Sequence, residues 1–130
     1  LHIKSKSLAT VVVSIKALYP EKKVTAVFQP HLYSRTKDFA DEFAESLSLL
    51  EEVILLDIYP AREEPIEGVS SQLVFDKIRS ANKMLCKKEE LLGLLRGMPL
   101  EVLVTFGAGD IDRLLLDIER LLKEKYPTDI

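Results

Sequence analysis

The sequence is poor in cysteine and histidine, the residues that form disulfides and zinc sites, with one cysteine and two histidines. The single cysteine, Cys86, cannot form an internal disulfide, which is typical of proteins in the reducing cytosol. Zinc sites need cysteine and histidine ligands clustered at short spacing, and His2 and His31 lie far apart along the chain. We therefore expect a cytoplasmic chain without a metal site of its own.

The lack of long apolar runs and of a positive net charge bears on two classes of binding partner, membranes and nucleic acids. No apolar run approaches the roughly 20 residues of a membrane span, and none resembles the apolar segment of a signal peptide. The 18 basic residues are outnumbered by 21 acidic ones, which gives a formal net charge of -3. Proteins that bind nucleic acids usually carry a basic face, so neither a membrane nor a nucleic acid is expected as a partner.

Common nucleotide-binding and hydrolase motifs are missing as well. The chain has no Gly-x-x-x-x-Gly-Lys-Ser/Thr phosphate loop and no Gly-x-Ser-x-Gly nucleophile turn. Gly107-Ala108-Gly109 resembles the start of a dinucleotide fingerprint, but the third glycine is absent and the motif follows the last expected strand. A tight turn that allows close packing, with Asp110 capping the next helix, explains these residues better.

What the sequence does contain is a regular alternation of strand-like and helix-like segments over 130 residues. Continuous apolar runs are typical of parallel strands covered on both faces, and apolar residues at three- and four-residue spacing indicate helices. We expect helices at 8–18, 35–50, 70–78, 88–95 and 111–122, and strands at 24–28, 53–58, 83–86 and 101–106. This pattern predicts a single α/β domain over residues 1–130, a three-layer Rossmann-like fold with a mostly parallel sheet and helices on both faces.

The most informative segment is 28–38, Phe-Gln-Pro-His-Leu-Tyr-Ser-Arg-Thr-Lys-Asp. It follows a strand and precedes a helix, so it lies at the carboxyl end of a strand, where open α/β sheets bind ligands. Pro30 stiffens this loop by fixing its own φ and restricting the residue before it. An arginine beside a histidine at a helix start suits a carboxylate or a phosphate. The polar residues of the loop are Gln29, His31, Tyr33, Ser34 and Arg35.

Each of these residues also has a structural explanation. Ser34 or Thr36 would cap the helix, His31 would donate a hydrogen bond to a carbonyl, and Arg35 would be a solvated surface charge. The chemistry of the segment alone leaves both interpretations open.

Two further loops are expected at the same edge of the sheet. Asp57, near the end of strand 53–58, could indicate a phospho-accepting receiver domain. Such a domain needs an acidic pair after the first strand to hold Mg²⁺, and this sequence lacks it. We therefore interpret this acid as one that orients loops at the cleft. The connection 59–69 is long enough to be functional, although a solvated loop with internal ion pairs is the default. The residues expected to line the cleft are Asp57, Arg62, Glu63, Gly107 and Asp110.

Three segments, taken in order, resemble the C-terminal domain of the Mur ligases. They are residues 27–39, residues 56–63 (Leu-Asp-Ile-Tyr-Pro-Ala-Arg-Glu) and residues 107–111 (Gly-Ala-Gly-Asp-Ile). The similarity extends from about Leu8 to the final helix. Within the family it is strongest to the members that add L-alanine to UDP-N-acetylmuramate, for which the Phe-Gln-Pro-His segment is quite specific.

The resemblance implies an ATP-dependent, cytoplasmic ligase of peptidoglycan synthesis, which joins L-alanine to the lactyl carboxylate of UDP-N-acetylmuramate through an acyl-phosphate, with Mg²⁺. Such enzymes have an N-terminal domain for the UDP-sugar, a central domain with the ATP phosphate loop, and a C-terminal domain that closes over the site and helps hold the amino acid. This chain resembles only the third, and it begins with Leu1 rather than Met. We therefore expect a fragment of a longer polypeptide that is inactive alone, with ATP and Mg²⁺ bound mainly by the central domain.

Carried over to this sequence, the resemblance implies substrate contacts at His31, Tyr33, Ser34 and Arg35, and no catalytic residue is assigned. Arg35 would hold a carboxylate or developing phosphate charge. Leu32 stands where many relatives have a second arginine, so part of the charge clamp is unassigned. Residues 1–7 do not match the family's Asp-Asp-Tyr-(Ala/Gly)-His-His-Pro segment, and we expect neither that segment nor the edge strand before it.

Two functions from other classes remain open. One is a stand-alone Rossmann-like module that binds a small anion through residues 29–36 without partner domains. The other is a structural or interaction domain, in which replacing Arg35 would leave the catalysis of a parent enzyme unchanged.

Overall fold

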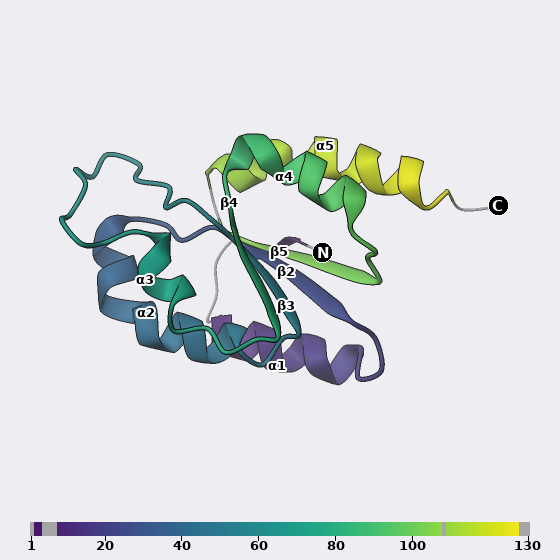
Figure 1. Ribbon diagram of the computed structural model, residues 1–130, viewed down its shortest axis with the longest axis horizontal. Helices are drawn as coiled ribbons and strands as arrows, with labels where there is room; N and C mark the ends of the chain where they lie inside the picture. The colour runs from purple at the N-terminus through teal and green to yellow at the C-terminus, as the bar shows by residue number, and fades with distance from the viewer. Residues whose placement is uncertain (1, 4–7, 108, 128–130) are drawn as a thin grey trace.

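The computed structural model describes residues 2–3, 8–107 and 109–127, in which strands and helices alternate (Figure 1). The helices are α1 (Leu8–Leu18), α2 (Tyr33–Leu47), α3 (Ser71–Phe75), α4 (Lys88–Gly97) and α5 (Asp110–Lys125). The strands are β1 (His2–Ile3), β2 (Val24–Phe28), β3 (Glu52–Leu56), β4 (Asn82–Cys86) and β5 (Val102–Phe106). They form one sheet in the order β1-β5-β2-β3-β4, and each pair of neighbours is parallel.

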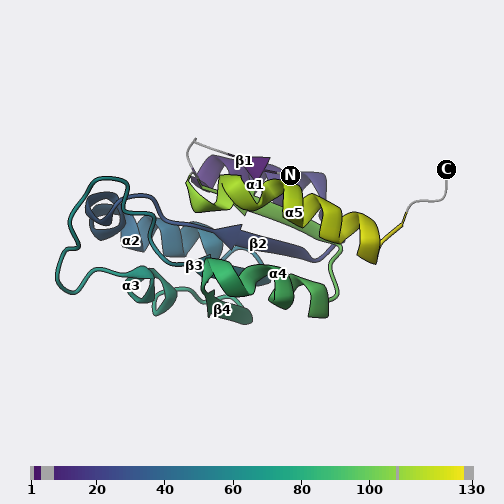
Figure 2. The ribbon, with the colours of Figure 1, turned by 90° about the horizontal axis from the view of Figure 1, so that it is seen from above.

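Helices cover both faces of this sheet (Figures 1 and 2). On one face α1, α2 and α3 bury apolar side chains that include Val12, Leu47 and Val74, and on the other α4 and α5 bury a second set. Alternate residues of a strand point to opposite faces, so Ala26 packs in the first core and Val27 in the second. Because both faces are covered, β2 and β3 are buried at every position. The expected Rossmann-like α/β fold is confirmed.

The start of α2 differs from the expectation in a way that affects the site. The helix begins at Tyr33 rather than at residue 35, and it ends at Leu47 rather than at residue 50. Leu32 has a φ of 71°, and its carbonyl accepts the N–H of Thr36 at 3.1 Å, which closes the first helical turn. Tyr33 and Ser34 therefore lie in the first turn of α2 and not in the loop.

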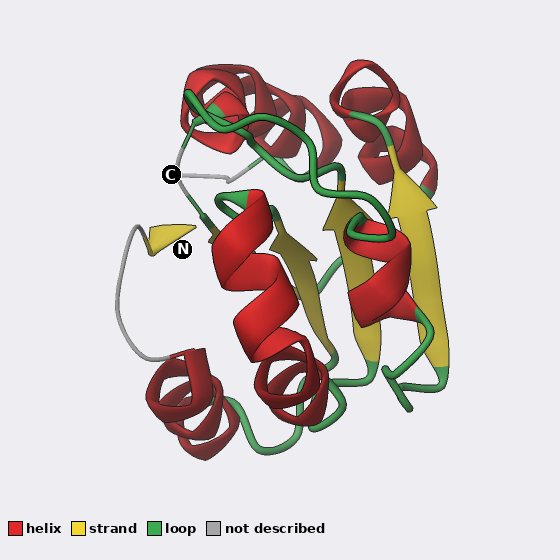
Figure 3. Cartoon of the chain, turned by 90° about the vertical axis from the view of Figure 1, so that its left-hand side faces the viewer, coloured by secondary structure: helices red, strands yellow, loops and turns green. Residues whose placement is uncertain are grey.

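Other element boundaries also differ from the expected ones. α3 ends at Phe75, because the N–H groups of Lys77 and Ile78 bond to carbonyls only three residues earlier. β3 ends at Leu56, and the chain then leaves as a long loop that projects beyond the sheet (at the left in Figure 1, and facing the viewer in Figure 3). α5 begins at Asp110, one residue earlier than expected.

The expectation that the chain lacks an edge strand before α1 is wrong. His2 and Ile3 pair in parallel with Thr105 and Phe106 of β5. A sheet edge offers unsatisfied backbone groups, so a short segment that runs past it can pair even without a family motif. No helix among the described residues is both long and apolar enough to cross a membrane.

Candidate functional site

The site lies where the carboxyl ends of β2 and β5 meet. These strands are neighbours in the sheet, but β2 leads into α2 on one face and β5 leads into α5 on the other. Such a divergence opens a crevice, which is where open α/β sheets bind ligands. Residues 29–32, residues 57–70 and the turn between β5 and α5 reach this edge, together with the start of α4.

The loops after β2 and β3 continue the sheet beyond the strands. The N–H of Tyr59 donates to the carbonyl of Pro30 at 2.9 Å, and the N–H of Leu32 donates to the carbonyl of Tyr59 at 2.9 Å. The His31 imidazole stacks on the Tyr59 ring, with 5.9 Å between centroids and 15° between planes. His31 is thus oriented by an aromatic ring and stays exposed at the edge of the sheet.

Glu63 caps the start of α2 from the neighbouring loop. Its Oε1 accepts the N–H of Ser34 at 3.0 Å, and its Oε2 accepts the Ser34 hydroxyl. These hydrogen bonds, the one from the hydroxyl first, lower the pKa of Glu63 below 4.5, and the His31 imidazole acts in the same direction. A carboxylate is favourable at a helix N-terminus, where N–H groups point outward.

The structural expectation that Ser34 or Thr36 caps α2 is therefore wrong. The N-cap residue is Leu32, which makes no side-chain cap bond. The Thr36 hydroxyl turns back to donate to the Leu32 carbonyl at 2.8 Å, and the Ser34 hydroxyl is engaged by Glu63.

The two arginines of the predicted site are exposed, and no hydrogen bond or ion pair joins either guanidinium group to another described residue. The Arg35 guanidinium carbon lies 5.6 Å from the ring centroid of Phe39, one turn along α2. Arg62 lies in the projecting loop, next to the Glu63 that holds Ser34. Tyr33, in the first turn of α2, is half-buried. Both guanidinium charges are thus available to an anion.

A second polar group lies on the β5 side of the crevice. Buried Gln29 donates from Nε2 to Asp110 Oδ2 at 3.2 Å and to the carbonyl of Asp57 at 3.2 Å. Lys88 Nζ, at the start of α4, lies 3.3 Å from Asp110 Oδ1. Together with Glu89 these residues line a hollow of about 180 Å³.

Asp110 does not cap α5, which corrects the sequence-based expectation. The N-cap is Gly109, and Asp110 is the first residue of the helix. Its carboxylate is turned instead toward Gln29 and Lys88.

The glycines of the last turn allow close packing, as expected. Gly107 has a φ of 133°, and a Cβ there would lie 2.8 Å from the carbonyl oxygen of Gln29. Gly109 has a φ of 94°, and a Cβ there would lie 2.5 Å from Cγ of Tyr59. Ala108 lies outside the described residues. The turn after β5 thus lies directly against the loops after β2 and β3.

The described residues provide neither a metal-binding cluster nor a reactive thiol. Among the described residues, no three His, Cys, Asp or Glu side chains cluster so that they could hold a metal ion. Cys86, at the end of β4, has a buried free thiol. Burial, and then the charges of Glu90 and Asp57, raise its pKa to about 11, so the thiol is protonated and unreactive at neutral pH.

The sequence analysis named Gln29 as a loop residue but gave it no role, and it did not assign Tyr59 or Lys88 to the site. Gln29 is only 2% exposed, and nothing in the sequence indicates that a polar residue at this strand end is buried. Tyr59 supports His31, and Lys88 pairs with Asp110. The available signal was position: each follows an expected strand, and the carboxyl ends of parallel strands share one edge.

Comparison with known proteins finds similar sequences in longer proteins. No protein-family model matches the chain. The sequence is 59% identical over 111 residues to the UDP-N-acetylmuramate–L-alanine ligase of Parabacteroides distasonis, covering 85% of this chain and 24% of that protein. It is 58% identical over 115 residues to the ligase of the same name from Phocaeicola vulgatus, covering 88% and 25%. The corresponding protein of Flavobacterium psychrophilum is 54% identical over 112 residues, covering 86% and 25%.

The chain therefore spans about a quarter of the length of these relatives. The resemblance drawn from the three loop segments is confirmed. This chain is a homologue of one part, about a quarter, of the UDP-N-acetylmuramate–L-alanine ligases.

Proposed function

We propose that this chain is the C-terminal domain of a UDP-N-acetylmuramate–L-alanine ligase, an ATP-dependent carbon–nitrogen ligase of peptidoglycan synthesis in the cytoplasm. The observation that carries the proposal is the 59% identity, over 85% of the chain, to a protein of that name. The complete enzyme would join L-alanine to the lactyl carboxylate of UDP-N-acetylmuramate. Its N-terminal and central domains would be this chain's partners.

In this proposal the domain closes as a lid over the activated carboxylate. His31 and Arg35 would face the reacting groups from the carboxyl edge of the sheet. The exposed, uncompensated guanidinium of Arg35 supports this role, because an oriented cation in a closed site stabilises a carboxylate or a developing negative charge. Closure would also exclude water that would otherwise hydrolyse the activated carboxylate.

ATP and Mg²⁺ are the cofactors that the complete ligase would use. The sequence has no phosphate loop, and the described carboxylates do not cluster as metal ligands. We propose that both are held mainly by the central domain. The contribution of this chain is to bind and orient the amino acid.

A stand-alone anion-binding module is not favoured, because the relatives are ligases about four times as long as the matched segment. Calorimetry on the isolated chain separates the two ideas. Tight binding of L-alanine, UDP-sugar or ATP by the chain alone would support the module and oppose the lid.

The direct test uses a chimera in which this chain replaces the matching quarter of the Parabacteroides distasonis ligase. We expect L-alanine-dependent release of phosphate from ATP by the chimera and none by the chain alone. Turnover by the isolated chain, or a folded chimera without activity, would contradict the proposal.

Replacing Arg35 with alanine in the chimera tests the assignment of the amino-acid site. Hydrogen bonds to charged groups contribute about 1.5–3 kcal/mol, so we expect the KM for L-alanine to rise about tenfold to hundredfold. Lys37→Ala is the control, because Lys37 is an exposed cation on the same helix. Equal kinetics for the two variants would favour a purely structural role for this face.

A further inference from the structure

The Gln29 side chain makes hydrogen bonds to two other segments of the carboxyl edge, the loop after β3 and the start of α5. Its Nε2 donates to the carbonyl of Asp57 after β3 and to the carboxylate of Asp110, both at 3.2 Å. Its Oε1 accepts the N–H of Ile111 at 2.9 Å. Its backbone N–H donates to the carbonyl of Phe106 at 3.0 Å. The residue thus joins the ends of β2, β3 and β5 and the start of α5.

The hydrogen-bonding pattern around Gln29 matches a carboxamide and no other common side chain of this length. Two partners, the Asp57 carbonyl and the Asp110 carboxylate, can only accept, whereas the Ile111 N–H can only donate. Glutamate would meet both acceptors with a third acceptor, and methionine would satisfy none of the partners. Gln29 is 2% exposed and its bond from the Ile111 N–H is buried, so water cannot readily replace the side chain as the acceptor for that N–H.

The contacts of Gln29 extend to the residues of the proposed site. On one side the Asp57 carbonyl leads in two residues to Tyr59, which stacks on His31. On the other side Asp110 carries the contact to Lys88. One buried amide therefore connects the imidazole side of the crevice to its carboxylate and lysine side.

We propose that Gln29 is a positioning residue, which sets where Asp110 and the 57–63 loop stand relative to His31 and thereby determines the affinity of the site for the amino acid. The kinetic part of this inference rests on the proposed function, and the structural part does not. Gln29 acts through these neighbours and is not a catalytic residue.

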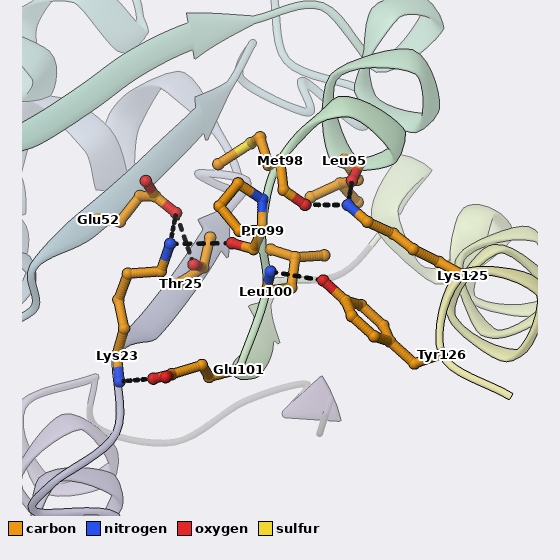
Figure 4. A network of polar contacts seen from close by, with 10 residues as sticks. All are labelled: Lys23, Thr25, Glu52, Leu95, Met98, Pro99, Leu100, Glu101, Lys125 and Tyr126. Atoms are coloured by element: carbon orange, nitrogen blue, oxygen red, sulfur yellow. Dashed lines mark hydrogen bonds and ion pairs between the residues drawn. The ribbon is translucent and has the colours of Figure 1, made fainter. Parts of the chain in front are cut away.

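The structural part is tested on the chain itself by NMR. In Gln29→Met we expect the backbone amides of Ile111 and Tyr59 to shift and the Ile111 amide to exchange about tenfold faster or more. The matched control is Thr25→Val on β2, the strand that leads to Gln29, which removes the buried 2.7 Å hydrogen bond from Thr25 to Glu52 at the opposite end of the strands (Figure 4). Unchanged amides in Gln29→Met, or equal changes in Thr25→Val, would overturn the inference.

If Gln29→Met does not fold, exchanging the amide and the carboxylate between positions 29 and 110 provides a second test. Gln29→Glu retains an acceptor for Ile111 but turns a carboxylate toward Asp110. Adding Asp110→Asn supplies an amide donor from the other side, whereas the Asp57 carbonyl still lacks a donor, so the double variant should recover part of the Ile111 amide position and of the thermal midpoint that Gln29→Glu loses. A double variant no better than Gln29→Glu would show that the contact between positions 29 and 110 does not hold this edge together.

The kinetic part is tested in the chimera. We expect Gln29→Met to raise the KM for L-alanine about tenfold while the KM for ATP stays unchanged, and Thr25→Val to alter neither. A parallel rise in both KM values would overturn the positioning role, because general loosening affects both substrates. If the unsubstituted chimera has no ligase activity, the proposed function fails, and the amide shifts alone then decide for or against the role of Gln29.

Discussion

Replacing Gly109 with alanine is expected to destabilise the chain by about 2–6 kcal/mol. Two effects contribute. With a φ of 94°, Gly109 has a backbone conformation that costs other residues about 1–3 kcal/mol. The added Cβ would also lie 2.5, 2.6 and 2.7 Å from Cγ, Cδ1 and Cδ2 of Tyr59, and overpacking of this kind costs about 1–3 kcal/mol.

The clash cannot be relieved cheaply, because it involves the base of the Tyr59 ring rather than a flexible side-chain end. The same ring stacks on His31 and its backbone pairs with Pro30 and Leu32. Movement of Tyr59 would therefore disturb the loop that carries the predicted site. For a chain of this length 1 kcal/mol corresponds to about 4 °C, so the thermal midpoint should fall by about 8 °C or more.

Thermal unfolding followed by circular dichroism measures this effect, with Gly93→Ala as the matched control. Gly93 lies inside α4 and has open space around it, so alanine there should stabilise the helix by about 0.5–1 kcal/mol. In a Tyr59→Ala background, Gly109→Ala should retain only its backbone cost. A midpoint within about 2 °C of the unsubstituted chain, or the same loss in both backgrounds, would refute the reasoning.

Two titratable groups give further predictions. Because folding lowers the pKa of Glu63, its stabilising effect is present above the ordinary value of 4.5 and is lost as the pH falls through the lowered value. Urea unfolding should therefore show a stability difference between the chain and Glu63→Gln at neutral pH that disappears in acid, and Ser34→Ala should move the NMR titration of Glu63 back up. Since folding raises the pKa of Cys86 from 9.0 to about 11, the stability it contributes is present below pH 9.0 and lost as the pH rises toward 11, relative to Cys86→Ala. Iodoacetamide should label Cys86 slowly in the folded chain at pH 8 and rapidly in urea, as followed by mass spectrometry; equal rates in the two states would contradict this protection.

The layered fold could be predicted because its signals are local and repeated. All five residues of β3 are buried, the last four of them apolar, and the alternation of such apolar runs with amphipathic helices specifies parallel crossovers. The same topology rule placed the three loop segments at one edge of the sheet, since parallel strands end together. Helix ends were less accurate, as at Tyr33, because the turn at Leu32 depends on a hydrogen bond from its N–H to the carbonyl of distant Tyr59.

What the sequence by itself determined is therefore the set of strands and helices other than the short edge strand β1, the edge on which ligand-binding loops gather, and which polar residues those loops carry. Only the tertiary structure decided how those residues are paired. The Ser34–Glu63 contact joins positions 29 residues apart, and the Gln29–Ile111 contact joins positions 82 residues apart. Burial periodicity is a property of neighbouring residues, whereas these hydrogen bonds form only because packing brings distant strand ends within about 3 Å of one another.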